Sequence, residues 1–155
     1  MSKSSKFDID LVTLDDIVVT NATIHNPNNI KLAKSEYSIN FWFTPGVNVA
    51  EKKIRLILTC EIKSTSPSDE HAVITGTFDL AYYFKIDNLE ELIKKIKENN
   101  DEVIIDNAVS ISLANIAYST SRGIIFTRCQ GTALGKVIIP ILPNDKIVKI
   151  FTDSE

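Results

Sequence analysis

The sequence has few of the residues from which metal sites, disulfide frameworks and phosphate-binding loops are built. Its 155 residues include two cysteines, two histidines and five glycines. Cys60 and Cys129 have no metal-ligand spacing to each other or to a histidine, so we expect two buried, reduced thiols. His25 and His71 are expected to be ordinary surface residues, and no glycine-rich phosphate loop is present. We therefore expect neither a metal nor another cofactor.

Long hydrophobic runs and clustered basic residues are also scarce. The longest apolar stretches, such as residues 137–142, are far too short to cross a bilayer. The polar residues 1–6 have no apolar run behind them, which predicts a disordered terminus without a signal peptide. A net charge of −3 argues against a nucleic-acid partner, because phosphate binding requires clustered lysine and arginine. We expect a cytoplasmic protein without membrane insertion, folded as a single domain over residues 1–155.

The first half of the chain has the period of β-strands. In residues 54–63 every even position is apolar, and most odd positions are polar. Residues 73–86 repeat this alternation, and so do residues 37–44. Because a strand sends alternate side chains to opposite faces, each segment is predicted to have one buried face and one wet face. A less regular first strand is expected from about residue 7 to 24, with a bulge at Asp15 and Asp16.

Turn residues separate these strand segments. The predicted joints are residues 26–29, Thr44-Pro45-Gly46 and residues 64–69, all rich in proline, glycine, asparagine, serine or aspartate. Four successive strands that are each wet on one side indicate an antiparallel sheet.

The second half changes to a helical period. A short lysine-rich helix is predicted from residue 88 to 99, and a long helix from about Asp106 to Gln130 with Gly131 as its stop. Residues 135–143 should be extended because two prolines and β-branched residues oppose a helix. Residues 144–151 are compatible with either a short helix or a strand. The fold class is therefore α+β, with a four-stranded antiparallel sheet and the helices packed on one face.

The long helix carries apolar residues on more than one face. One side can rest on the sheet, and the other then needs a partner, for which a second copy of the chain is the simplest candidate. Several small residues on this helix would allow another element to approach closely: Ala114, Ala117, Ser119, Ser121 and Gly123. We expect a homo-oligomer.

Catalytic motifs are absent from the sequence, so we expect a protein that is not an enzyme. Isolated aspartates near the first strand, such as Asp8 and Asp10, more often keep a sheet edge soluble than perform chemistry.

The positions of the aromatic residues are the clue to a binding function. Trp42 and Tyr83 fall on the otherwise polar face of their strands, where either core packing, oligomer packing or a partner can account for them.

The order of elements, together with one local motif, resembles the SecB family of export chaperones. The motif consists of residues 117–122 (Ala-Tyr-Ser-Thr-Ser-Arg), then Gly131-Thr132, then residues 137–140 (Val-Ile-Ile-Pro). It is similar to the family's long-helix segment of aromatic, proline, tyrosine, small residue and arginine, which runs to Gly-Thr and a short apolar stretch ending in proline. Ser119 and Thr120 stand where the family usually has proline and tyrosine.

The resemblance implies an ATP-independent holdase that binds unfolded polypeptides in apolar grooves, assembled as a homotetramer from two dimers. A groove between the sheet, the crossover and the long helix would then hold the client. The implied peptide-binding residues are Phe78, Tyr82, Phe84, Leu89, Leu92 and Tyr118.

Two pathways remain open within the resemblance. Export chaperones of the family deliver clients to the SecA translocation motor, whereas divergent SecB-like proteins act as chaperones for antitoxins. A dedicated chaperone or assembly partner of one specific protein is therefore the alternative to a general holdase. A small enzyme or small-molecule binder with a scattered site is a third reading.

Overall fold

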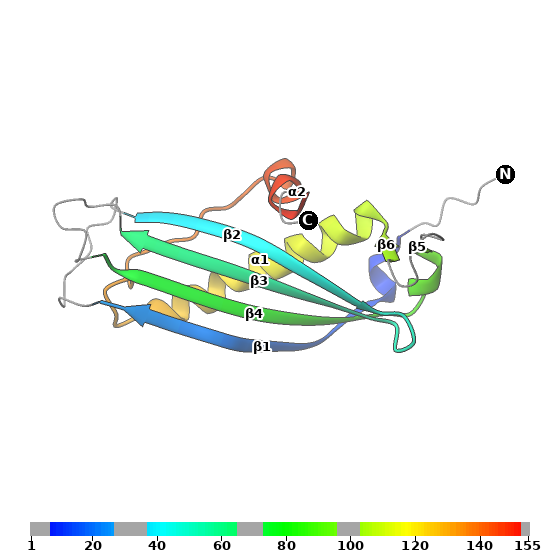
Figure 1. The fold of residues 1–155 in the computed structure, drawn as a ribbon, viewed down its shortest axis with the longest axis horizontal. Coiled ribbons are helices and arrows are strands. Elements are labelled where there is room, and N and C mark those ends of the chain that lie inside the picture. The colour runs from blue at the N-terminus through cyan, green and yellow to red at the C-terminus, as the bar shows by residue number, and fades with distance from the viewer. Residues whose placement is uncertain (1–6, 27–36, 65–72, 96–102, 153–155) are drawn as a thin grey trace.

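The computed structural model describes residues 7–26, 37–64, 73–95 and 103–152 (Figure 1). In chain order the elements are η1 (Ile9–Leu11), β1 (Val12–His25), β2 (Tyr37–Asn48), β3 (Lys53–Ser64), β4 (Thr75–Ile86), η3 (Leu89–Glu91), β5 (Ile93–Lys95), β6 (Val103–Ile105), α1 (Asn107–Cys129) and α2 (Asn144–Thr152). The predicted disorder of residues 1–6 and most of the turns predicted at 26–29 and 64–69 lie outside the described residues. His71 lies outside them as well.

The four long strands form one antiparallel sheet in the order β1-β4-β3-β2, so β1 and β2 are its edges. The predicted alternation is confirmed, because the even positions of β3 from Ile54 to Ile62 are at most 2% exposed. In β4 the residues on the same face, from Phe78 to Ile86, are at most 1% exposed. One face of the sheet therefore carries the core.

The bulge predicted in the first strand is confirmed. The β1–β4 register skips a residue between Leu14 and Asp16, and a second skip follows between Val19 and Asn21. The Asp16 carboxylate accepts a hydrogen bond from the backbone N–H of Ile17 (2.8 Å), which holds the irregular backbone in place.

The joint predicted at Thr44-Pro45-Gly46 is wrong, because all three residues lie inside β2. Proline is tolerated there since β2 is an edge strand, where a missing N–H need not break a ladder bond. The turn comes later, between Asn48 and Lys53. The Asn48 side chain accepts a hydrogen bond from the Glu51 backbone (3.1 Å), and Lys52 has a positive φ of 56°.

The short helix predicted from residue 88 is also wrong in the part that the structure describes. Residues Leu89–Glu91 form a single 3-10 turn, and Ile93–Lys95 form strand β5, which pairs antiparallel with β6. The β-branched residues of this pair favour a strand, and Ile93 lies opposite Ile105. The remainder of the predicted helix, residues 96–99, lies outside the described residues.

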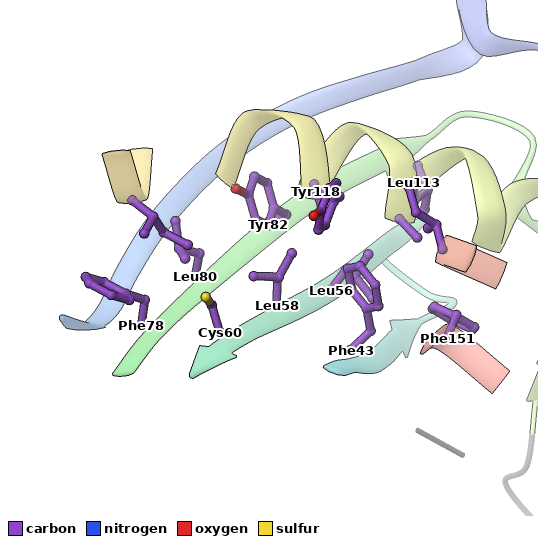
Figure 2. Close-up of a cluster of buried hydrophobic side chains, with 14 of the residues drawn as sticks. Phe43, Leu56, Leu58, Cys60, Phe78, Leu80, Tyr82, Leu113, Tyr118 and Phe151 are labelled. Carbon is purple, nitrogen blue, oxygen red and sulfur yellow. The ribbon is translucent and has the colours of Figure 1, made fainter. Parts of the chain in front are cut away.

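Helix α1 matches its prediction to within a residue at each end. The Asp106 carboxylate caps it by accepting a hydrogen bond from the Ala108 N–H (2.8 Å), and Gly131 follows its end at a φ of +77°. One face of α1 is buried on the sheet, and Figure 2 shows Leu113 and Tyr118 of this face among the core side chains.

In the connection from α1 to α2, residues 137–143 have no regular secondary structure, whereas Gly135 and Lys136, the start of the predicted extended segment, lie in a turn. The open choice for residues 144–151 resolves as helix α2. The Phe151 ring lies 6.0 Å from that of Phe43, so α2 packs on the same sheet face as α1. Both cysteines are free and buried, as expected. None of the described helices is long and apolar enough to cross a membrane.

Candidate functional site

The six residues expected to line a groove are all in the core. Phe84, Tyr82 and Leu89 are 0% exposed, and the other three, Phe78, Leu92 and Tyr118, are at most 2% exposed. Figure 2 shows Phe78, Tyr82 and Tyr118 pointing into the layer between the sheet and α1. In this conformation none of the six presents a surface to a partner, because each of them is packed inside the hydrophobic core.

An open apolar groove lies instead beside the β2 edge of the sheet. It has a volume of about 450 Å³, within the usual size range of ligand pockets. We call it the β2–α2 groove. Its lining residues are Ile39, Asn40, Phe41, Pro140, Leu142, Lys146, Lys149 and Ile150.

Strand β2 and two consecutive segments near the C-terminus supply the walls of the groove. Strand β2 contributes Ile39 and Phe41, which point to the helix side of the sheet and are only partly buried because β2 has no further strand beside it among the described residues. The connection between the helices contributes Pro140 and Leu142, and α2 contributes Ile150 with its two lysines. The groove is therefore apolar along its floor.

Tyr118 supports the groove from beneath although it does not line it. Its ring meets the Phe41 ring edge-on, at 5.1 Å between centroids and 74° between planes. Its hydroxyl donates a hydrogen bond to the Pro140 carbonyl (2.9 Å). Burial raises the pKa of Tyr118 to about 12, with Arg122 opposing and Cys60 adding to the effect, so the hydroxyl stays protonated at neutral pH. One side chain thus positions two walls.

Three residues of the motif, Tyr118, Arg122 and Thr132, form hydrogen bonds within the segment that follows α1 or to it. Arg122 donates from Nε to the Ile139 carbonyl (3.0 Å), one residue before the bond made by Tyr118. The Thr132 hydroxyl donates to the Cys129 carbonyl (2.7 Å) and accepts from the Leu134 N–H (3.1 Å). The motif therefore fixes the path of the chain from the end of α1 to the groove.

Sequence reasoning missed the groove. The structure shows that the connection between the helices, which forms one of its walls, also exposes large apolar side chains. Val137 and Ile139 are at most 4% exposed, whereas Ile138 is 55% exposed and Ile141 80% exposed. Large apolar side chains exposed on an extended segment are typical of an interaction surface. The prolines at 140 and 143 indicated an extended segment, yet nothing in the sequence said which of its isoleucines would face solvent.

Three side chains with metal-binding or nucleophilic groups, Asp79, Cys60 and Cys129, lie outside the groove. No group of three or more metal-binding side chains occurs among the described residues. Asp79 is held in a polar network on the outer sheet face, where it accepts hydrogen bonds from Thr59 (2.6 Å) and Asn21 (3.3 Å). Burial raises the pKa of Cys129 to about 11, and the pKa of Cys60 is also raised, so neither thiol is activated as a nucleophile.

Comparison with known proteins supports the fold. No family model and no curated protein matches the sequence. Among solved structures, the chain resembles the SecB-like chaperone Rv1957 of Mycobacterium tuberculosis, solved in complex with a ChAD peptide from the antitoxin HigA1. The TM-score is 0.62 at 14% identity, and the match covers 86% of this chain and 92% of that one. A protein of unknown function from Streptococcus agalactiae matches at a TM-score of 0.34 and 13% identity, too low to carry an argument. The chain therefore has the fold of a SecB-like chaperone.

Replacing Tyr118 with phenylalanine should remove the bond to Pro140 and keep the ring contact with Phe41. We expect a loss of about 0.5–1.5 kcal/mol in the free energy of unfolding, measured by urea denaturation near pH 8. A tyrosine whose pKa rises from about 10 to about 12 on folding stabilises the protein below pH 10, and this contribution is lost as the pH rises to 12. The Tyr118→Phe variant should therefore lose less of its free energy of unfolding than the wild-type chain does between pH 10 and pH 12.

The control for this experiment is Tyr83→Phe, which changes a tyrosine on the outer face of the sheet. Equal effects of Tyr118→Phe and Tyr83→Phe at both ends of the pH range would contradict a special role for Tyr118.

Proposed function

We propose that this chain is an ATP-independent, non-enzymatic chaperone that holds extended segments of unfolded polypeptides in the β2–α2 groove. The observation that carries the proposal is an open groove with an apolar floor beside an edge strand. Unfolded chains expose apolar side chains, and each Å² buried contributes roughly 25 cal/mol. An extended segment can also form backbone hydrogen bonds with an edge strand.

The shared fold supports this proposal. The SecB-like chaperone from M. tuberculosis was solved with a peptide bound, so its fold is compatible with peptide binding. For the present chain the same role rests on the groove described above. Of the six residues expected to bind clients, Tyr118 would then act beneath the groove, through its contacts with Phe41 and Pro140.

A dedicated role is the second candidate. The partner of the M. tuberculosis protein is an antitoxin peptide, which is a single defined client. Delivery of many clients to the SecA motor in the cytoplasm would instead depend on an acidic outer sheet face, as in the export chaperones. Here that face carries both signs of charge, including ion pairs of Lys53 with Asp15 (3.6 Å) and Lys63 with Glu61 (3.1 Å). The mixed charge favours the dedicated role over protein export.

We also propose that the chain assembles through the face of α1 that points away from the sheet, as a dimer of dimers. Phe126 lies on this face and is 47% exposed, and Gly123 has open space above its Cα. A large apolar ring beside small residues is typical of a helix-to-helix contact between subunits.

Replacing Leu142 with serine should weaken binding of a fluorescent unfolded peptide by roughly five- to thirtyfold, because one apolar wall of the groove is lost. Suppression of aggregation should fall in parallel when two unrelated unfolding proteins are used as clients. A general holdase protects both of these proteins, whereas a dedicated chaperone protects only its own client.

The matched control is Val18→Ser, since Val18 is an apolar side chain on the outer sheet face with 38% exposure. Thermal melts of both variants establish that they are folded. If Val18→Ser reduced peptide binding as much as Leu142→Ser did, the groove would not be the client site.

Replacing Phe126 with arginine should convert the proposed oligomer to smaller species, because a charge would be placed in an apolar contact. Sedimentation velocity at micromolar concentration measures the change. Ile104→Arg is the control, since Ile104 is 52% exposed on strand β6. A wild-type chain that sediments as a monomer would contradict the proposed assembly.

A further inference from the structure

The charged side chains that line the β2–α2 groove are of one sign. Two of its eight lining residues carry a charge, and both are lysines of α2, Lys146 and Lys149. They are three positions apart, so they lie on neighbouring parts of the same helix face. No aspartate or glutamate lines the groove. This differs from the chain as a whole, which has a net charge of −3.

The carboxylates of Glu61 and Asp145, on elements beside the groove, are not among its lining residues. Glu61 lies opposite Asn40 on the outer face of the sheet and forms an ion pair with Lys63 (3.1 Å). Asp145 lies in the first turn of α2, where the helix dipole favours a carboxylate. Lys146 is exposed and forms no ion pair with another described residue. Lys146 therefore places a positive charge at the rim of the groove.

We infer that the groove selects extended segments in which apolar side chains are followed or preceded by aspartate or glutamate. This inference rests on the proposed function and names the class of client. Apolar residues would occupy the floor formed by Ile39, Phe41 and Leu142, while a client carboxylate accepts a hydrogen bond from the Lys146 ammonium group. A segment with basic residues in the same place is disfavoured, because it brings two like charges together.

The expected difference in affinity between acidic and basic clients is modest, because Lys146 is exposed to solvent. An exposed ion pair changes affinity by roughly two- to fivefold, and the effect falls with salt because the pair is screened. The apolar floor supplies most of the affinity, and the lysines supply discrimination between clients of similar hydrophobicity. A basic-flanked segment should thus still bind, but more weakly than an acidic-flanked one.

Two fluorescent peptides test the inference. They share one apolar core of isoleucine, leucine and phenylalanine and differ only in having glutamate or lysine at the flanking positions. The wild-type chain should bind the glutamate peptide roughly two- to fivefold more tightly at low salt, and high salt should reduce the ratio. Lys146→Glu should abolish or reverse the preference.

Lys85→Glu is the matched control, because it makes the same charge change at an exposed position on the outer sheet face. It should leave the preference intact. If Lys85→Glu and Lys146→Glu changed the ratio equally, the net charge of the chain would be responsible, and the inference would be overturned.

The remaining outcomes separate this inference from the proposed function. Equal binding of both peptides by the wild-type chain, with no effect of Lys146→Glu, would overturn the charge selection and leave the groove as a client site. Binding of neither peptide, together with no suppression of aggregation, would overturn both. A change in sedimentation caused by Lys146→Glu, with no peptide binding, would show that a second copy of the chain occupies the groove.

Discussion

Two walls of the groove, strand β2 and the connection between the helices, are joined by one side chain, Tyr118. Its ring packs against Phe41 of the edge strand, and its hydroxyl holds the Pro140 carbonyl of the connection between the helices. Because α1 is fixed on the sheet by its buried face, these two contacts transmit the position of the helix to both sides of the groove. The adjacent bond from Arg122 to Ile139 fixes the same segment a second time. The buried side chains of Val137 and Ile139 add further contacts that keep the connection against the core.

The same arrangement explains how an apolar surface can stay open on a folded domain. The core is complete without the groove, since the central strands and α1 bury one another. The edge strand β2 lies at the margin of that core, so Ile39 and Phe41 are covered on one side only. Lysines at the rim keep such a surface solvated, because their long stems cover apolar area while their charged ends remain in water. Ile39, Phe41, Leu142 and Ile150 are partly buried and pack against this core, so they stabilise the fold on one side and leave the other side open to the proposed client.

Sequence patterns predicted the strands and the long helix because each has a clear period and recognisable end residues, such as Asp106 and Gly131. Predictions from these patterns were wrong where the local structure depends on the position of a segment in the tertiary fold. Proline at position 45 is compatible with a strand only because β2 is an edge, and the sheet order is not visible in the sequence. The burial of the expected binding residues could not be foreseen for a similar reason. An alternating apolar pattern is the same for a buried face and an open groove, and only the covering helix decides which of the two a residue such as Tyr82 belongs to.

Hydrogen–deuterium exchange with and without a bound unfolded peptide tests the central claim most directly, because it locates the site without any substitution. The account predicts slower exchange in β2 and in residues 137–150, with β1 unchanged, since a bound segment would shield the edge strand and the walls of the groove. Protection confined to β1, or to the outer sheet face around Trp42 and Tyr83, would contradict the assignment of the groove.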